Sequence, residues 1–190
     1  MSQNQQSRVA IPGDIFILLA PSAQELYLLR QKQLEFQRQY GGQIASHIHI
    51  TSERLSPKYE GFPKECAAVI KHHIANLVPF PVFVDALIQF RAPYWKSHVL
   101  RWRVQDTDTW LNFREALAKT LKGIDCPSHF DRHRRSTCSI LNLDNPITLN
   151  EKKHAANFPY KLFTAREMYI SQLKKNYQFE ILETIQLSGK

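Results

Sequence analysis

The stretch SHIHIT, residues 46–51, carries the strongest fold signal in this sequence, because apolar and polar residues alternate along it. Alternation with a period of two predicts a β-strand, which we expect over residues 44–51. Side chains two residues apart share a face of a strand, so His47, His49 and Thr51 would point the same way. Polar side chains on a packed face are costly unless they meet water or a ligand. The pattern therefore favours a ligand-binding cleft over a packed face.

Regular elements are predicted on both sides of this strand from apolar periodicity and from capping, glycine and proline signals. Because helices alternate with hairpin-like pairs of strands, we expect an α+β fold with two lobes and largely antiparallel sheets around a central cleft. The predicted helices cover residues 22–40, 63–78 and 107–122, and the predicted strands cover residues 14–20, 44–51, 82–90, 97–104, 139–143, 147–149, 165–173 and 177–187.

The composition of the 190-residue chain is that of an ordinary globular protein, with 43% hydrophobic and 22% charged residues. We expect residues 1–12 to be a disordered tail and residues 13–190 to form a single two-lobed domain. No apolar run reaches the roughly 18 residues needed for a membrane span, so we expect no membrane association. The three cysteines form no CxxC pair, which argues against a zinc knuckle or disulfide framework and favours the cytoplasm.

The formal net charge of +8 favours a polyanionic partner, of which nucleic acid is the commonest. The alternative is that the excess of basic residues serves only colloidal stability. Two further explanations of the His47–His49 pair also stay open. The histidines could be satisfied or solvent-facing groups on an edge strand, or they could bind a metal. No third ligand stands at a telling spacing, so we expect no metal.

Two short motifs resemble those of a known superfamily. His49-Ile50-Thr51 is similar to the first of two His-x-Thr/Ser motifs in the two-histidine phosphoesterases, which include 2′-5′ RNA ligases and cyclic phosphodiesterases. The segment 145–149, Asn-Pro-Ile-Thr-Leu, resembles the second motif. Pro146 stands there where the histidine is expected. The order of elements from Asp14 to Leu187, including the closing pair of strands, resembles the family as well.

The resemblance implies metal-free and cofactor-free chemistry on a 2′,3′-cyclic phosphate or on 2′,5′-linked nucleotide or RNA. One histidine would act as a base and the other as an acid, while the two threonines would hold phosphate oxygens. The family roles carry over to His49, Thr51 and Thr148.

Pro146 cannot transfer a proton, and three explanations remain open. The chain could be a degenerate member that binds RNA or nucleotide phosphates without turnover. His47 could supply the second imidazole from the same strand. A loop histidine could instead fold into the cleft; the candidates are His129, His133 and His154.

Three other residues are candidates for substrate binding. Arg101 and Arg103 alternate with Trp102 in the strand predicted at 97–104, and they would bind phosphate if their face lines the cleft. The alternative interpretation is that this face of the sheet is simply exposed to solvent. Tyr94 could stack on a base, although it could also simply cover the end of a sheet. The basic cluster at residues 132–135 could contact a nucleic-acid backbone, or it could be a charged surface loop.

Overall fold

The computed structural model of this chain describes residues 9–74, 76–92, 97–123, 135–150, 154, 156–175 and 178–189. These ranges hold three helices and nine strands. The helices are α1 (Ala23–Tyr40), α2 (Phe62–Ile74) and α3 (Asp108–Gly123). The strands are β1 (Ile15–Leu19), β2 (Gln43–Ile44), β3 (Ile50–Leu55), β4 (Phe80–Ala92), β5 (Ser97–Val104), β6 (Thr137–Leu143), β7 (Tyr160–Ala165), β8 (Glu167–Leu173) and β9 (Phe179–Gln186).

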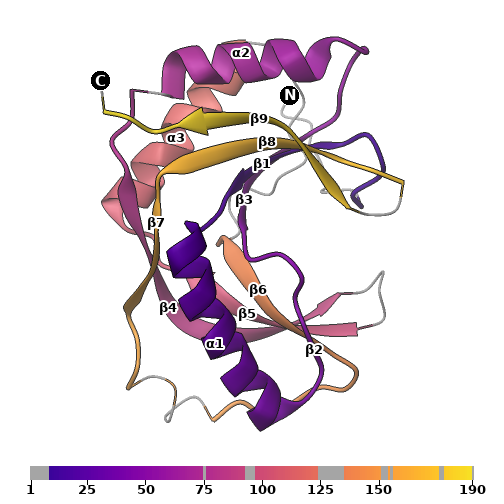
Figure 1. Cartoon of the computed structure of the whole chain (residues 1–190), viewed down its shortest axis with the longest axis vertical. Coiled ribbons are helices and arrows are strands. Elements are labelled where there is room, and N and C mark those ends of the chain that lie inside the picture. The colour runs from indigo at the N-terminus through magenta and orange to yellow at the C-terminus, as the bar shows by residue number, and fades with distance from the viewer. Residues whose placement is uncertain are drawn as a thin grey trace, which may run out of the picture.

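The described strands form one sheet in the order β7-β4-β5-β6-β3-β1-β8-β9, with β2 added beside β6. Every strand pairing in this sheet is antiparallel. Figure 1 shows the sheet curling into two halves, with β1, β8 and β9 beside α2 at the top and β4, β5 and β6 beside α1 below. The predicted α+β fold with antiparallel strands and flanking helices is confirmed.

The alternation along β5 selects its buried face. Leu100 and Trp102 have no exposed surface, and Phe36 of α1 packs against Trp102 with ring centroids 6.1 Å apart. One hydrophobic cluster joins this face of the sheet to buried residues of all three helices. The helices therefore occupy one face of the curled sheet, and the side chains that alternate with the buried ones point to the opposite face.

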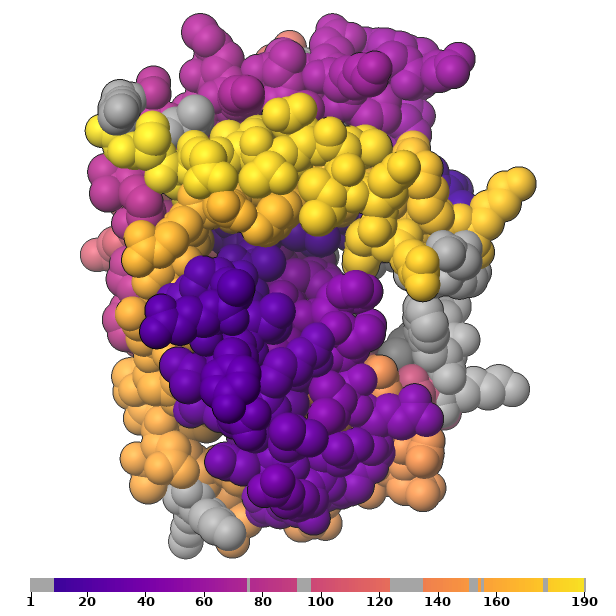
Figure 2. Space-filling model, viewed as in Figure 1, coloured from indigo at the N-terminus to yellow at the C-terminus, as the bar shows by residue number. Residues whose placement is uncertain are grey.

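Helix α1 begins and ends where its capping residues allow. The Ser22 hydroxyl accepts from the backbone N–H of Glu25, and the Glu25 carboxylate accepts from the backbone N–H of Ser22. The same carboxylate accepts from the backbone N–H of Thr164 at 2.8 Å, which ties the start of α1 to β7. Gly41 ends the helix at a positive φ of 73°. In the space-filling view, α1 covers the lower front of the molecule (Figure 2).

The strand predicted over residues 44–51 is divided in the structure. Residues 43–44 form β2, residues 45–49 form a loop, and β3 begins only at Ile50. The interruption has a cause in α1, since Arg30 donates to the backbone carbonyls of Ala45 and Ser46. Those carbonyls are thereby satisfied by a helix side chain instead of by a neighbouring strand.

The strand predicted at residues 147–149 is wrong, since this segment has no regular structure. Ile147 and Leu149 pack against the hydrophobic cluster, which explains their apolar character. The backbone N–H of Ile147 donates to the Gln89 side chain at 2.7 Å rather than to a strand.

Two smaller differences concern other elements. Helix α2 ends at Ile74 instead of residue 78, and β7 was not among the predicted strands. Within the described ranges, no helix combines the length and the hydrophobicity that a bilayer span requires.

Candidate functional site

Two strands from distant parts of the chain meet at a single residue pair. Ile50 of β3 pairs with Cys138 of β6, and neither side chain has any exposed surface. Because side chains alternate along a strand, Thr51 on one strand and Thr137 and Ser139 on the other point to the opposite face. His49, which directly precedes β3, continues this alternation. We call the surface that carries these four side chains the site face.

The antiparallel pairing gives the four side chains a local two-fold arrangement. Counting from the Ile50–Cys138 pair sets His49 opposite Ser139 and Thr51 opposite Thr137. A two-fold axis through that pair exchanges His49 with Thr137 and Thr51 with Ser139. The His-x-Thr of β3 is therefore matched by a Thr-x-Ser on β6, and Thr137 occupies the place symmetric to His49.

Sequence reasoning missed Thr137 and Ser139. A signal was present, because Thr137-Cys138-Ser139 is followed by an apolar pair and comes after the third helix. The sequence Ile-Thr-Leu at residues 147–149 fits the letters of the second motif, so sequence reasoning assigned the motif to that segment instead. Only the pairing of β3 with β6 identifies the matching segment.

Arg101 lies beside this group of residues, as expected if its face of β5 is the functional one. It pairs with Ser139 across β5 and β6, and its Nη1 donates to the Thr137 hydroxyl at 3.2 Å. Its guanidinium carbon lies 5.1 Å from the centre of the Phe90 ring on β4. These contacts hold a permanent positive charge at the β6 side of the site face.

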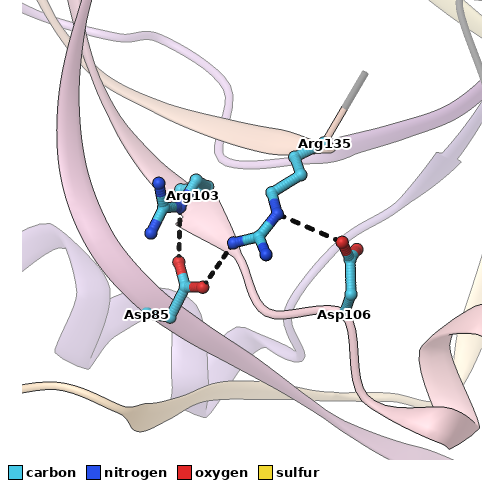
Figure 3. Close-up of polar contacts among 4 residues, drawn as sticks. All are labelled: Asp85, Arg103, Asp106 and Arg135. Carbon is cyan, nitrogen blue, oxygen red and sulfur yellow. Dashed lines mark hydrogen bonds and ion pairs between the residues drawn. The ribbon is translucent and has the colours of Figure 1, made fainter. Parts of the chain in front are cut away.

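Arg103, the other predicted arginine, belongs to a network of charged residues (Figure 3). Its Nε donates to Asp85 at 2.7 Å, and Arg135 Nη1 donates to the other oxygen of Asp85 at 2.7 Å. Arg135 also lies 3.1 Å from Asp106. Two arginines here face two aspartates, so their charges largely compensate. Of the basic cluster at residues 132–135, only Arg135 lies within the described residues.

The His49 imidazole is held in its neutral form. Burial is the main cause that lowers its pKa from 6.5 to about 4, and electrostatic interaction with the nearby His47 and Arg101 side chains lowers it further. The ring also contacts Phe179 edge to face, with centroids 5.4 Å apart. At neutral pH this imidazole is uncharged, and the positive charge of the site face comes from arginine.

The candidate second histidines lie in different places. His47 is exposed in the loop before β3 and is close enough to His49 to contribute to the lowered pKa of His49. His154 lies on the helix-covered face, where its Nε2 is 2.5 Å from the Tyr40 hydroxyl of α1. His129, His133 and the predicted base-stacking residue Tyr94 lie outside the described residues.

Thr148 lies away from the site face. Its neighbour Ile147 is hydrogen-bonded to Gln89, and Gln89 pairs with Leu100, whose side chain belongs to the buried core. Residues opposite each other across two strands share a face, so Gln89 points to the helix-covered side. The sheet thus separates this segment from His49, and we do not include Thr148 in the site.

Two polar side chains of α1 brace the site from behind. Gln33 has no exposed surface, and its Nε2 donates to the backbone carbonyls of Ile140 at 3.0 Å and Ala45 at 3.4 Å. Arg30 donates to the Gln33 side chain at 2.7 Å and to the Ala45 carbonyl at 2.6 Å. The loop that leads to His49 and the strand that carries Ser139 are therefore held by the same helix.

Among the described residues, no three His, Cys, Asp or Glu side chains gather in a way that could hold a metal ion. The polar groups next to the Ile50–Cys138 pair include the His49 imidazole, the hydroxyls of Thr51, Thr137 and Ser139, and the Arg101 guanidinium. Hydroxyl and guanidinium groups donate hydrogen bonds, so this set is suited to an anion with several oxygens.

Comparison with known proteins shows which solved structures share the fold of this chain. No family model matches the sequence, and no curated protein matches it. Solved structures do match: the chain has the fold of LigT and of a structure described as a phosphoesterase, over at least 93% of its length. The resemblance to two-histidine phosphoesterases is thereby confirmed at the level of the fold.

Three of these structures illustrate the similarity. TT0787 of Thermus thermophilus has a TM-score of 0.66 and 16% identity, and the match covers 93% of this chain and 99% of that one. Escherichia coli LigT in complex with phosphate has a TM-score of 0.60 and 13% identity, covering 94% and 99%. Usb1 of Kluyveromyces marxianus has a TM-score of 0.54 and 10% identity, covering 93% and 99%.

The brace from α1 leads to a stability prediction. Gln33→Met keeps the side-chain volume close to that of glutamine but removes one of the two hydrogen bonds that the Ile140 carbonyl accepts, the other coming from the backbone N–H of Ala45. The free energy of unfolding should therefore fall by about 1 kcal/mol. Urea denaturation followed by circular dichroism measures the change. Gln31→Met, at an exposed position of the same helix, is the control and should change stability by less than about 0.5 kcal/mol. Equal losses in both variants would contradict the bracing role.

The pKa of His49 leads to a prediction about pH. Because this pKa is about 4 in the folded chain, against 6.5 for an unperturbed histidine, the unfolded chain binds more protons between these values. The free energy of unfolding should therefore fall as the pH is lowered through this window, by about 3 kcal/mol in all. Denaturation series at several pH values should show a shallower fall for His49→Gln than for His72→Gln, an exposed α2 position. Parallel curves for the two variants would contradict the assignment.

Proposed function

We propose that this chain is a two-histidine phosphoesterase-like protein that binds the phosphate of a nucleotide or an RNA end on the site face. The observation that carries the proposal is the Ile50–Cys138 pairing. It sets one imidazole and three hydroxyls on the same surface, and Arg101 lies next to them. In a cytoplasmic setting, nucleotides and RNA ends are the phosphate esters that the excess of basic residues would favour.

Each group has a distinct part in holding the phosphate. Hydroxyls of Thr51, Thr137 and Ser139 donate hydrogen bonds to phosphoryl oxygens, and Arg101 supplies the compensating charge. Arg103 contributes less, because Asp85 already accepts from its Nε. The related fold of E. coli LigT has been crystallised with phosphate, ATP and 3′-AMP, which supports a nucleotide phosphate as the ligand.

The symmetric partner of His49 favours binding over turnover of a cyclic phosphate. General acid–base chemistry at phosphorus needs a base for the attacking oxygen and an acid for the leaving oxygen. Thr137 stands where a second imidazole would complete the pair, and a threonine hydroxyl is too weak an acid to protonate a leaving oxygen near neutral pH. We therefore propose a site that keeps the hydrogen-bond donors for phosphate but lacks the proton donor for the leaving group.

A second candidate function is hydrolysis that uses His49 alone. It is favoured by the neutral state of this imidazole, since an uncharged imidazole can accept a proton from water. Such a site would act only on esters whose leaving group departs without being protonated. His47, exposed beside His49, would not lie across the phosphate from it.

The binding proposal predicts metal-independent affinity for nucleotide phosphates. With EDTA present, calorimetry should show that the chain binds 3′-AMP and 2′,3′-cyclic AMP. Arg101→Gln should weaken binding about tenfold or more, because a charge-assisted hydrogen bond is lost. Lys119→Gln, on α3 and paired with Glu115, is the charge-matched control and should bind like the wild type. No binding by folded wild type, or equal affinity in both variants, would refute the proposal.

The two functions predict different reactivity toward two substrates. A base-only site should slowly hydrolyse bis(p-nitrophenyl) phosphate, whose leaving group needs no proton, and His49→Ala should abolish the reaction. It should leave 2′,3′-cyclic AMP intact, because the ribose oxygen must be protonated to leave. Absorbance and chromatography assays with EDTA measure both reactions. No turnover of either substrate would leave binding as the only function. Rapid turnover of the cyclic phosphate that requires His47 would show that a second imidazole is in place.

A further inference from the structure

The site face continues past His49 and Thr51 into an apolar region. Thr51 pairs with Leu18 of β1, and Leu18 pairs with Tyr169 of β8. Residues paired in this way share a face of the sheet. A small hydrophobic cluster occupies this region, separate from the main core. Its members are Phe16, Leu18 and Leu173, with Ala10, Tyr169 and Phe179 packed against them.

The site face therefore has two sides of different chemistry. On the β5 and β6 side lie Arg101 and the hydroxyls of Thr137 and Ser139. On the β1, β8 and β9 side lie aromatic and aliphatic groups. His49 and Thr51 lie on the boundary between the two sides. A ligand that filled both sides would need an anionic group and a flat apolar group close together.

Phe179 lies where the two sides meet. Its ring is 5.4 Å from the His49 ring and 5.1 Å from the Phe16 ring, with interplanar angles of 77° and 70°. Phe16 itself is only 8% exposed, whereas Phe179 and Tyr169 are half-buried. These two rings therefore supply the accessible aromatic surface of the apolar side.

The Tyr169 ring is held by a hydrogen bond from its hydroxyl. Its hydroxyl donates to the Glu167 carboxylate, which also accepts from the Gln186 side chain at 2.7 Å. A side chain held in this way loses little freedom when a ligand packs on it. The apolar side thus combines one anchored ring with one ring that touches the imidazole.

We propose that the apolar side receives the nucleobase of the bound nucleotide, which packs on Phe179 and Tyr169 while its phosphate lies at His49 and Thr51. This inference rests on the proposed function and adds the class of ligand, a nucleotide with its base attached instead of a simple phosphate or sugar phosphate. Base–aromatic packing accepts any base, and a purine covers more ring surface than a pyrimidine. The order of affinity is therefore AMP, then UMP, then ribose 5-phosphate.

Calorimetry with three ligands that differ only in the base tests the inference. Wild type should bind AMP about tenfold more tightly than ribose 5-phosphate. Phe179→Leu should lower the affinity for AMP to that for ribose 5-phosphate and leave the affinity for inorganic phosphate unchanged. Phe179→Tyr should restore the preference for AMP. Tyr27→Leu replaces a ring that is 65% exposed on α1, and this control should behave as wild type.

A nuclear magnetic resonance measurement on wild type keeps the test independent of how well the variants fold. The adenine protons of bound AMP should shift upfield, as protons over an aromatic ring do. Equal affinity for AMP and ribose 5-phosphate with no upfield shift would overturn the inference and leave phosphate binding intact. A loss of inorganic phosphate binding in Phe179→Leu would also overturn it, by showing that Phe179 acts through His49. No binding of any ligand by wild type would instead refute the proposed function.

Discussion

The pairing of Ile50 with Cys138 is the constraint on which the site depends. These two residues form the described register between β3 and β6, and their strands come from segments almost ninety residues apart, so nothing local aligns them. Burial of both side chains fixes the face on which their neighbours emerge, because a slip of one residue would turn every side chain over. Gln33 of α1 secures the same register from behind by binding the backbone on each side of the junction.

The net charge of the chain says less about phosphate binding than the ion pairs that individual arginines form. The net charge of +8 suggested polyanion binding, but two arginines on this side of the molecule, Arg103 and Arg135, are already bound to aspartates. Arg101 donates to the Thr137 hydroxyl and lies over the Phe90 ring. Its position also explains part of the lowered pKa of His49. One fixed cation next to a neutral imidazole is a different electrostatic arrangement from two titrating histidines.

The sequence alone predicted the fold class, the three helices and the strand at residues 97–104, because these features depend on local periodicity and capping. It also named His49, Thr51, Arg101 and Arg103 among its candidate site residues, and their side chains emerge on one face of the sheet; their roles stay predictions. It could not place the second motif. Residues 147–149 match the motif only in their amino-acid sequence. The structural equivalence of residues 137–139 with residues 49–51 depends on the long-range pairing of β3 with β6, which leaves no local sequence pattern. The loop at residues 45–49 was missed for a related reason, since it is shaped by Arg30 of another element.

Holding a phosphate and breaking one are physically separable tasks on this face. Hydrogen-bond donation by hydroxyls and a guanidinium needs no change of protonation, so it survives the replacement of an imidazole by threonine. Proton transfer to a leaving oxygen is different, because a hydroxyl such as that of Thr137 is too weak an acid to act as the general acid near neutral pH. The symmetry of the β3–β6 junction makes the difference specific, since Thr137 stands at the position that the two-fold axis relates to His49. The proposed function therefore needs from this face only hydrogen-bond donors and a fixed cation such as Arg101 to compensate the charge of a phosphate.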